Sequence, residues 1–224
     1  LTVDDKNDVI EMITKSFYEK GDIERYFKNE INRTVYAEFL EPVWNSIVEK
    51  GLSFVVKDLN HQIVGVALNF DAYDEPEFEV NSRLIVIIEM LIYLEEPIKY
   101  VTNTSLTFNY FQLCRDNNLP NGLGQVLHGF MMATSADFNA SENVACIYFM
   151  EKELLALARR KSFAGIFTTN TSPLTQQLGS DVNAYKTMIE YRINQFVYHD
   201  GSKPFQKAPD SVTVMVQWKD IRNE

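Results

Sequence analysis

The chain of 224 residues is poor in the residue types that form disulfides, bind metals or contact nucleic acids. Its two cysteines, Cys114 and Cys146, stand alone in the sequence, so neither a disulfide framework nor a thiolate metal site is indicated. The three histidines show no spacing typical of a shared metal, and we expect no metal cofactor. Lys and Arg total 21 against 31 Asp and Glu, and this formal net charge of -10 argues against a nucleic-acid partner.

Long hydrophobic runs are also missing. The longest candidate, over residues 84–94, is shorter than the about 20 residues that a membrane helix needs, and it contains Glu89. We therefore expect no membrane partner. Isolated cysteines without a recognisable signal sequence favour a reducing, cytoplasmic location. The chain starts at Leu1 instead of Met, so we expect it to be a piece of a longer polypeptide.

Two catalytic motifs are absent as well. There is no His-His-x-x-x-Asp-Gly sequence, which excludes an ordinary peptide-synthetase condensation domain. There is no Gly-x-Ser-x-Gly elbow either, so a serine hydrolase is unsupported. What the chain does contain is 46% hydrophobic and 12% aromatic residues, which is enough for a substantial core in one domain over residues 1–224.

Hydrophobic periodicity predicts helices and one hairpin in the first half of the chain. Apolar residues at helical spacing predict helices over residues 4–21, from residue 23 to beyond residue 27, over 35–50 and over 84–94, the last ended by Pro97. Two β-prone runs, over residues 52–57 and 62–70, predict a hairpin, and the acidic residues 71–79 predict a surface loop.

Strands alternate with helices in the second half. The predicted elements are strands over residues 130–135, 164–169, 184–198 and 212–218, a long helix over 144–160, and a short helix that opens at Ser172-Pro173. Together with the first half, this order predicts an α+β fold with a mixed, mostly antiparallel central sheet flanked by helices.

This order of elements resembles the GNAT (Gcn5-related N-acetyltransferase) fold, in the form found in insect arylalkylamine N-acetyltransferases. Ser135-Ala136-Asp137 stands where that family ends a strand in Ser-Val-Asp, and residues 171–176 stand where it has a Ser/Thr-rich turn before a helix. Lys203-Pro204-Phe205 resembles its closing Pro-rich loop. The resemblance covers essentially the whole chain.

Residues 58–70 and 163–178 resemble more closely the terminal, amine-selecting domain of insect β-alanyl amine synthases, which follows an adenylation domain and a carrier domain. The resemblance implies transfer of β-alanine from a phosphopantetheine thioester on the carrier to dopamine, histamine or a similar amine. The implied partners are the upstream carrier and adenylation domains of the same polypeptide. Two alternatives remain: a free-standing arylalkylamine N-acyltransferase that uses acyl-coenzyme A, and a non-catalytic module that binds amine or carrier.

The loop before the long helix separates these alternatives. Acyl-coenzyme A enzymes of this layout have a Gly-rich loop with Arg here, which lets backbone N–H groups receive the pyrophosphate. This chain has Ser141, Glu142 and Asn143 instead, and two like charges about 4 Å apart repel by roughly 4 kcal/mol near a protein surface. Free acetyl-coenzyme A is therefore not the expected donor. The alternative reading is that Glu142 simply caps the helix.

The pantetheine arm of a carrier needs backbone partners, and the two strands that flank the long helix supply them if they splay apart. The residues expected to contact this arm are Met132, Ala133, Thr134, Thr168 and Asn170. Ser135 and Asp137 then follow near the thioester, and Asp137 is a candidate for binding the β-alanyl ammonium group.

Aminolysis of a thioester also needs a base, because arylalkylamines are mostly protonated near neutral pH. The resemblance to the arylalkylamine family places this carboxylate on Asp22, with Glu19 and Glu24 as rivals nearby. It places the paired hydroxyls of that family on Thr171 and Thr175, next to Ser172. The alternative is that Asp22 and these hydroxyls only cap helices.

Further candidates are less specific. The acidic residues Asp71, Asp74 and Glu75 either contact a cationic substrate or belong to a solvated loop. Four aromatic side chains either line an amine pocket or belong to the core: Phe17, Tyr18, Tyr110 and Phe111.

Overall fold

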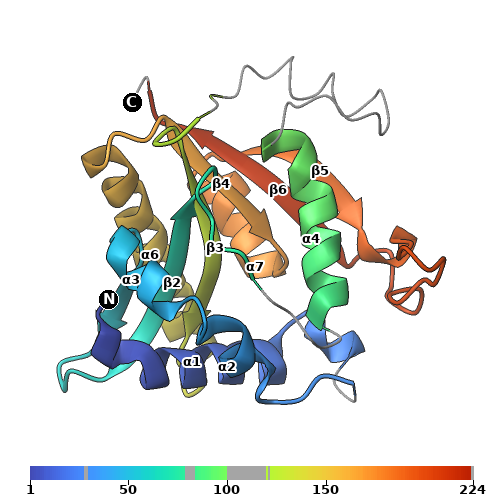
Figure 1. Ribbon diagram of the computed structural model, residues 1–224, viewed down its shortest axis with the longest axis horizontal. Coiled ribbons are helices and arrows are strands. Elements are labelled where there is room, and N and C mark those ends of the chain that lie inside the picture. Colours follow the sequence, from blue (N-terminus) through green and yellow to red (C-terminus); the bar gives the residue numbers. More distant parts are fainter. Residues whose placement is uncertain (28–29, 79–83, 100–119, 121, 223–224) are drawn as a thin grey trace.

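A six-stranded sheet forms the centre of the computed structural model, which describes residues 1–27, 30–78, 84–99, 120 and 122–222 (Figure 1). In spatial order, the strands are β1 (Phe54–Lys57), β2 (Ile63–Asp71), β3 (Val126–Thr134), β4 (Gly165–Asn170), β6 (Thr213–Asp220) and β5 (Lys186–Arg192). Only β3 and β4 pair in parallel, and the other four pairings are antiparallel. The sheet is therefore mixed and mostly antiparallel, as predicted.

Helices cover both faces of this sheet, and hydrophobic contacts assign each helix to a face. The helices are α1 (Lys6–Thr14), α2 (Val35–Leu40), α3 (Trp44–Lys50), α4 (Leu84–Lys99), α6 (Ala140–Arg160) and α7 (Pro173–Gln177). We call the face covered by α1 to α4 the α1 face, because their buried residues share a core with sheet residues such as Phe70 and Phe167. The opposite face, with α6 and α7, is the α6 face, where Leu154 packs with Leu127 and Ile166.

Figure 1 shows α4 in front of the β5–β6 half of the sheet and α7 behind it. Tyr93 of α4 contacts Tyr191 of β5, with ring centroids 6.5 Å apart. None of the helices in the described ranges combines the length and apolarity that crossing a bilayer requires.

Several elements differ from their predicted bounds for identifiable reasons. The expected helix over residues 35–50 is two helices, because the chain turns at residues 41–43, where Pro42 cannot donate a backbone hydrogen bond. β3 starts four residues before the expected strand over 130–135, and β5 stops at Arg192, where a 3₁₀ turn follows. Pro97 does not end α4, which continues to Lys99.

The acidic segment after β2 is more than the predicted surface loop. Asp71 is buried and accepts a hydrogen bond from the backbone N–H of Tyr73, at 3.0 Å. Phe78 stacks on Phe39 and on Phe130, with ring centroids 4.4 and 5.2 Å apart. This aromatic stack holds the segment against the α1 face.

Candidate functional site

The central parallel pair of strands opens partway along its length. The register of β3 and β4 runs from Val126 with Gly165 to Gly129 with Thr168, although β3 continues to Thr134. Beyond Gly129, the backbone N–H and C=O groups of β3 on the side of β4 therefore do not pair with β4. A cavity of about 720 Å³ lies at this divergence.

Both strands, α4, α6, the residues after β2 and the turn before α7 contribute to the wall of this cavity. Gly129 lines the cavity at the last paired position of β3, where a Cβ atom would lie 3.3 Å from Leu154 of α6. Across from it, the Thr168 hydroxyl donates to the Gly129 carbonyl at 3.2 Å. The sequence therefore leaves an opening where the strands part, and side chains from both faces reach it.

On the α1 face, the cavity holds a buried carboxyl. Glu24 is 9% exposed and accepts a hydrogen bond of 3.0 Å from the Tyr36 hydroxyl. Burial raises the pKa of Glu24 to about 7, while the hydrogen bond from Tyr36 opposes the rise. Burial and the nearby carboxylate raise the pKa of Tyr36, so this phenol stays protonated. Glu24 is therefore a carboxyl that can gain or lose a proton near neutral pH.

The surroundings of Glu24 are aromatic and tightly packed. The rings of Phe17 and Tyr36 lie 5.7 Å apart, and both residues line the cavity. Gly21 lies against the carboxyl, because a Cβ atom at that position would come within 2.1 Å of Glu24 Oε2. A flat, apolar group with a positive charge matches this part of the cavity.

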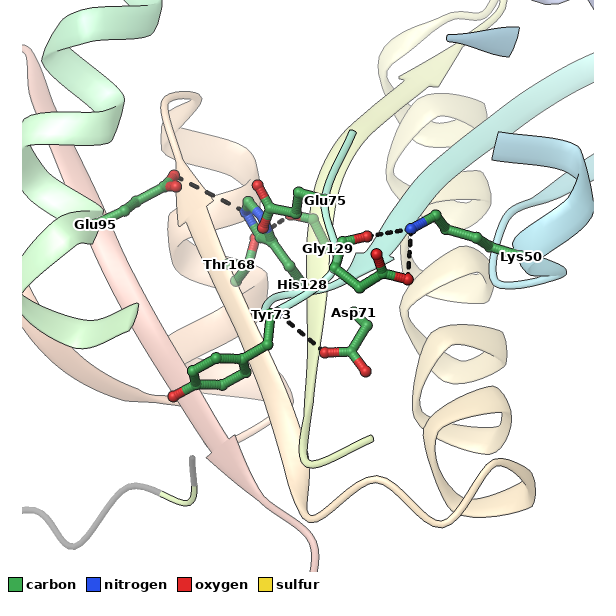
Figure 2. A network of polar contacts seen from close by, with 9 residues as sticks. Lys50, Asp71, Tyr73, Glu75, Glu95, His128, Gly129 and Thr168 are labelled. Carbon is green, nitrogen blue, oxygen red and sulfur yellow. Dashed lines mark hydrogen bonds and ion pairs between the residues drawn. The ribbon is translucent and has the colours of Figure 1, made fainter. Parts of the chain in front are cut away.

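A second group of acidic residues borders the same cavity (Figure 2). His128 of β3 is 2% exposed, and its Nδ1 lies 2.7 Å from Glu75 Oε1. Its Nε2 lies 3.8 Å from Glu95 Oε1 of α4. The rings of Phe130 and Phe167 enclose the imidazole. His128 thus holds two cavity-lining carboxylates in place on the α1 face.

The α6 face supplies one more buried carboxyl, from Glu151 of α6. Glu151 is 5% exposed, lines the cavity and accepts a hydrogen bond of 3.2 Å from the Tyr185 hydroxyl. Burial raises the pKa of Glu151 to about 7. Elsewhere in the cavity wall, the hydroxyl of Thr169 on β4 is buried without a hydrogen-bond partner among the described residues.

The turn before α7 is fixed by a network of buried amides. Gln217 Oε1 accepts from Asn170 Nδ2 at 2.6 Å, and Gln176 Nε2 donates to the Asn170 carbonyl at 3.0 Å. These bonds hold the start of α7 at the end of β4. The Thr175 hydroxyl donates to the Ser172 carbonyl at 3.0 Å. Ser172 and Thr175 line the cavity together with Thr171, and the role of these hydroxyls stays a prediction.

The N-terminus of α6 is closed by its own side chains. The Asn139 side chain accepts hydrogen bonds from the backbone N–H groups of Ser141 and Glu142, at 2.9 and 3.0 Å. In return, Glu142 Oε2 accepts from the Asn139 N–H at 2.9 Å. This capping box starts the helix four residues earlier than predicted. Glu142 therefore caps the helix, and its effect on a bound phosphate stays a prediction.

The structure brings together some of the predicted site residues and separates others. Those that line the cavity are Glu24, Met132, Thr168, Asn170, Thr171, Ser172 and Thr175. Those that are not among the described lining residues are Asp22, Glu19, Ala133, Thr134, Ser135 and Asp137.

Specific contacts explain the second group. Glu19 is exposed and pairs with Arg33 at 3.7 Å, and Asp137 is exposed as well. The hydroxyl of Thr134 bonds to Asn143. Of the aromatic candidates, Phe17 lines the cavity and Tyr18 does not, while Tyr110 and Phe111 lie outside the described residues.

Sequence reasoning missed Glu151, Tyr36 and Thr169. Glu151 did leave a signal, because it interrupts the apolar stripe of α6 that Ile147, Leu154 and Ala158 form at helical spacing. Tyr36 and Thr169 left none, because their importance comes from contacts between distant segments. In the part of the chain that the structure describes, no three His, Cys, Asp or Glu residues cluster closely enough to hold a metal ion.

A mixed sheet whose parallel central strands diverge over a cavity is the layout of the GNAT-type acyltransferases. Crystal structures agree, since the chain superposes on arylalkylamine N-acetyltransferase 2 from Aedes aegypti with a TM-score of 0.72 at 16% identity, over 99% of this chain and 96% of that one. This likeness shows the fold and confirms the predicted class. No family model matches the chain.

A solved C-terminal condensation domain of Ebony, in complex with β-alanyl-dopamine, is 47% identical to this chain, which covers 96% of it with a TM-score of 0.88. The chain belongs to this family of Ebony C-terminal domains. It is also 47% identical over 222 residues to the β-alanyl-bioamine nonribosomal peptide synthetase ebony of Drosophila melanogaster. That match takes in 99% of this chain and 23% of the relative.

Proposed function

We propose that this domain forms the amide bond between β-alanine and a biogenic amine with an aromatic or imidazole ring, such as dopamine or histamine. The observation that carries the proposal is the Glu24 carboxyl, buried beside Phe17 and Tyr36 in the cavity where β3 and β4 diverge. The relative solved with β-alanyl-dopamine supports it, because that compound is the amide such a reaction forms.

Glu24 acts as the base in this proposal. Its carboxylate accepts the proton of the substrate ammonium, and the neutral nitrogen then attacks the carbonyl carbon of the β-alanyl thioester. The C–N bond forms and the C–S bond breaks, and the sulfur leaves as a thiolate that takes up one proton. Nitrogen loses two protons in all: the first goes to Glu24 and from there to solvent, and the second, lost as the amide forms, is delivered to sulfur. Thr171 and Thr175 line the cavity and stay candidates for passing that proton.

The donor in this proposal is the phosphopantetheine thioester of a carrier domain. Asn139 and Glu142 close the N-terminus of α6, which removes the support for a coenzyme A pyrophosphate. A carrier-borne arm has a single phosphate held by the carrier, and its two amides can pair with the open backbone of β3 beyond Gly129. The partners that we propose are therefore the adenylation and carrier domains of the same polypeptide, in the cytoplasm.

The test compares two donors. The domain is incubated with dopamine and either a β-alanyl carrier domain or acetyl-coenzyme A, and products are identified by mass spectrometry. We expect β-alanyl-dopamine from the carrier and little acetyl transfer. Efficient acetyl transfer without β-alanyl transfer would instead identify an N-acyltransferase that uses acyl-coenzyme A. Binding of amine and carrier without any product would identify a non-catalytic module.

A further inference from the structure

The cavity contains two buried carboxyls of similar kind on opposite faces of the sheet. Glu24 lies with Phe17 and Tyr36, which pack against the core of the α1 face. Glu151 lies on α6, one turn before Leu154 in the core of the α6 face. Aminolysis of a thioester needs one base on the side of the nucleophile, so the proposed reaction leaves Glu151 without an assigned role.

The aromatic side of the cavity suits the amine, and the α6 side suits the donor. Glu151 lies eleven residues after Ala140, which at 1.5 Å per residue is about 17 Å along α6. A pantetheine arm has the backbone length of about five extended residues, or about 17 Å. An arm that passes the N-terminus of α6 and follows the open edge of β3 therefore ends at the level of Glu151.

Glu151 is equipped to receive a cation there. Glu151 Oε2 accepts the hydrogen bond from the Tyr185 hydroxyl, and within the described part of the chain the other carboxyl oxygen has no hydrogen bond or ion pair. The cavity wall also includes the apolar residues Leu154, Met132 and Gly129, while the polar side chains of Thr168 and Asn170 in the same wall are hydrogen-bonded to Gly129 and Gln217. Lys152, the next residue, is exposed, and its ammonium lies 5.1 Å from the centre of the Tyr148 ring. A cation that enters from the cavity meets a carboxyl with a free oxygen and little competing solvent.

We infer that Glu151 binds the terminal ammonium of the β-alanyl chain and so selects an aminoacyl donor over a simple acyl donor. The inference rests on the proposed function, because it needs a β-alanyl thioester in the cavity. In β-alanine, two methylene groups separate the carbonyl carbon from this ammonium. Replacing the ammonium with a methyl group gives the butyryl chain, which has the same shape and no charge. Glu151 discriminates between these two donors by charge alone.

The experiment measures kcat/KM for β-alanyl-pantetheine and butyryl-pantetheine thioesters with dopamine, in the wild-type domain and in Glu151→Gln. Gln retains an oxygen that can accept the Tyr185 bond. Loss of one partner of a buried ion pair predicts a fall of about 100-fold with the β-alanyl donor and less than about 3-fold with the butyryl donor. Glu153→Gln is the matched control, since Glu153 is on the same helix and is not among the described cavity-lining residues. It should leave the donor preference unchanged.

Each result has one meaning. An equal loss with both donors in Glu151→Gln, or no loss, overturns the inference while the proposed function stands. Failure of the wild-type domain to use either thioester contradicts the proposed function itself. If the variant does not fold, wild-type affinities for the unreactive amide analogues of the two donors decide, measured by calorimetry. The β-alanyl analogue should bind at least about 10-fold more tightly, and equal affinities contradict the inference.

Discussion

The carboxyl of Glu24 can act as a base near neutral pH because burial raises its pKa to about 7. In the proposed reaction, only its ionised form accepts the proton of the amine. We therefore expect single-turnover rates at saturating amine to rise with pH through about 7 and then level off. Glu24→Gln should remove this rising part of the pH–rate profile, which we call the limb, and lower the rate by at least about 100-fold.

Two neighbouring variants make this prediction specific. Asp22→Asn should keep the limb, because Asp22 is not among the described cavity-lining residues. Tyr36→Phe should move the limb to higher pH, since the Tyr36 hydroxyl bond favours the ionised form of Glu24. If Asp22→Asn abolishes the limb and Glu24→Gln keeps it, the base is Asp22, as the sequence alone suggested.

The same two buried carboxyls make stability depend on pH. The pKa values of Glu24 and Glu151 rise from 4.5 to about 7 on folding, so the folded state binds these protons more tightly. Each contribution is complete below pH about 4.5 and is lost as the pH rises through about 7. Gln does not titrate, so the unfolding free energy of Glu151→Gln minus that of wild type should rise by about 3 kcal/mol when the pH is raised from 5 to 8. Urea unfolding at both pH values measures this, and an unchanged difference would contradict the raised pKa.

In the proposed function, the capped N-terminus of α6 disfavours free coenzyme A as the donor. Gln at position 142 can retain the hydrogen bond to the Asn139 N–H, but it removes the negative charge beside the helix end. Glu142→Gln should therefore tighten the binding of free coenzyme A by about 2- to 5-fold, as measured by calorimetry. Pantetheine, which lacks the pyrophosphate, should bind both proteins equally. A gain for pantetheine as well would mean that Glu142 acts on the arm and not on the phosphates.

The pairing of β4 with β6 depends on a glycine. A Cβ atom at Gly165 would lie 2.3 Å from the Lys219 carbonyl and 2.4 Å from the Trp218 ring, and the backbone of a central strand cannot move away. Gly165→Ala should cost at least about 2 kcal/mol of unfolding free energy, from urea titration. Gly129→Ala is the comparison, because the nearest contact of its Cβ would be the flexible end of Leu154, at 3.3 Å, and the Thr168 and Phe167 oxygens would lie at 3.7 and 3.8 Å. Similar losses of unfolding free energy in both variants would show that the backbone of β6 moves away from the added methyl group.

The type of most elements could be predicted from the sequence, because each depends on local periodicity. The hairpin of β1 and β2, the strand β6 and the helix α6 follow directly from the spacing of apolar residues. The residues at which these elements begin and end depend on local contacts that cannot be derived from the spacing of apolar residues. The Asn139–Glu142 capping box starts α6 early, and the turn at Pro42 separates α2 from α3.

The candidate site was harder to predict than the fold. The turn with Thr171 and Thr175 was found because its residues are close in sequence and resemble a family motif. The base was narrowed to Asp22, Glu19 and Glu24, and three-dimensional packing separates them, since only Glu24 of the three is buried in the cavity wall. Glu151 acquires its role from a fold that brings α6 against the opening between β3 and β4.

The domain as a whole places its two proposed substrates on opposite faces of one sheet. In the proposed reaction, the amine reaches Glu24 from the α1 face and the donor reaches Glu151 from the α6 face. Residues of both faces line the cavity that begins where the pairing of β3 and β4 ends, at Gly129 and Thr168. The bond between the substrates can therefore form inside the cavity while the bulk of a carrier domain stays outside.

This arrangement predicts how much of the donor's affinity comes from the carrier itself. The cavity contacts the arm and its acyl group alike in β-alanyl-pantetheine and in a β-alanyl carrier, so kcat should agree within about 3-fold. The KM of the carrier should be lower by at least about 10-fold, because docking adds contacts outside the cavity and linkage in one polypeptide raises the effective concentration. Steady-state kinetics are measured with β-alanyl-pantetheine, with the free carrier and with the carrier fused to Leu1. The comparison separates the contribution of docking from the contribution of linkage. Equal KM values for all three donors would show that the arm alone is recognised, and the closed N-terminus of α6 would then need another explanation.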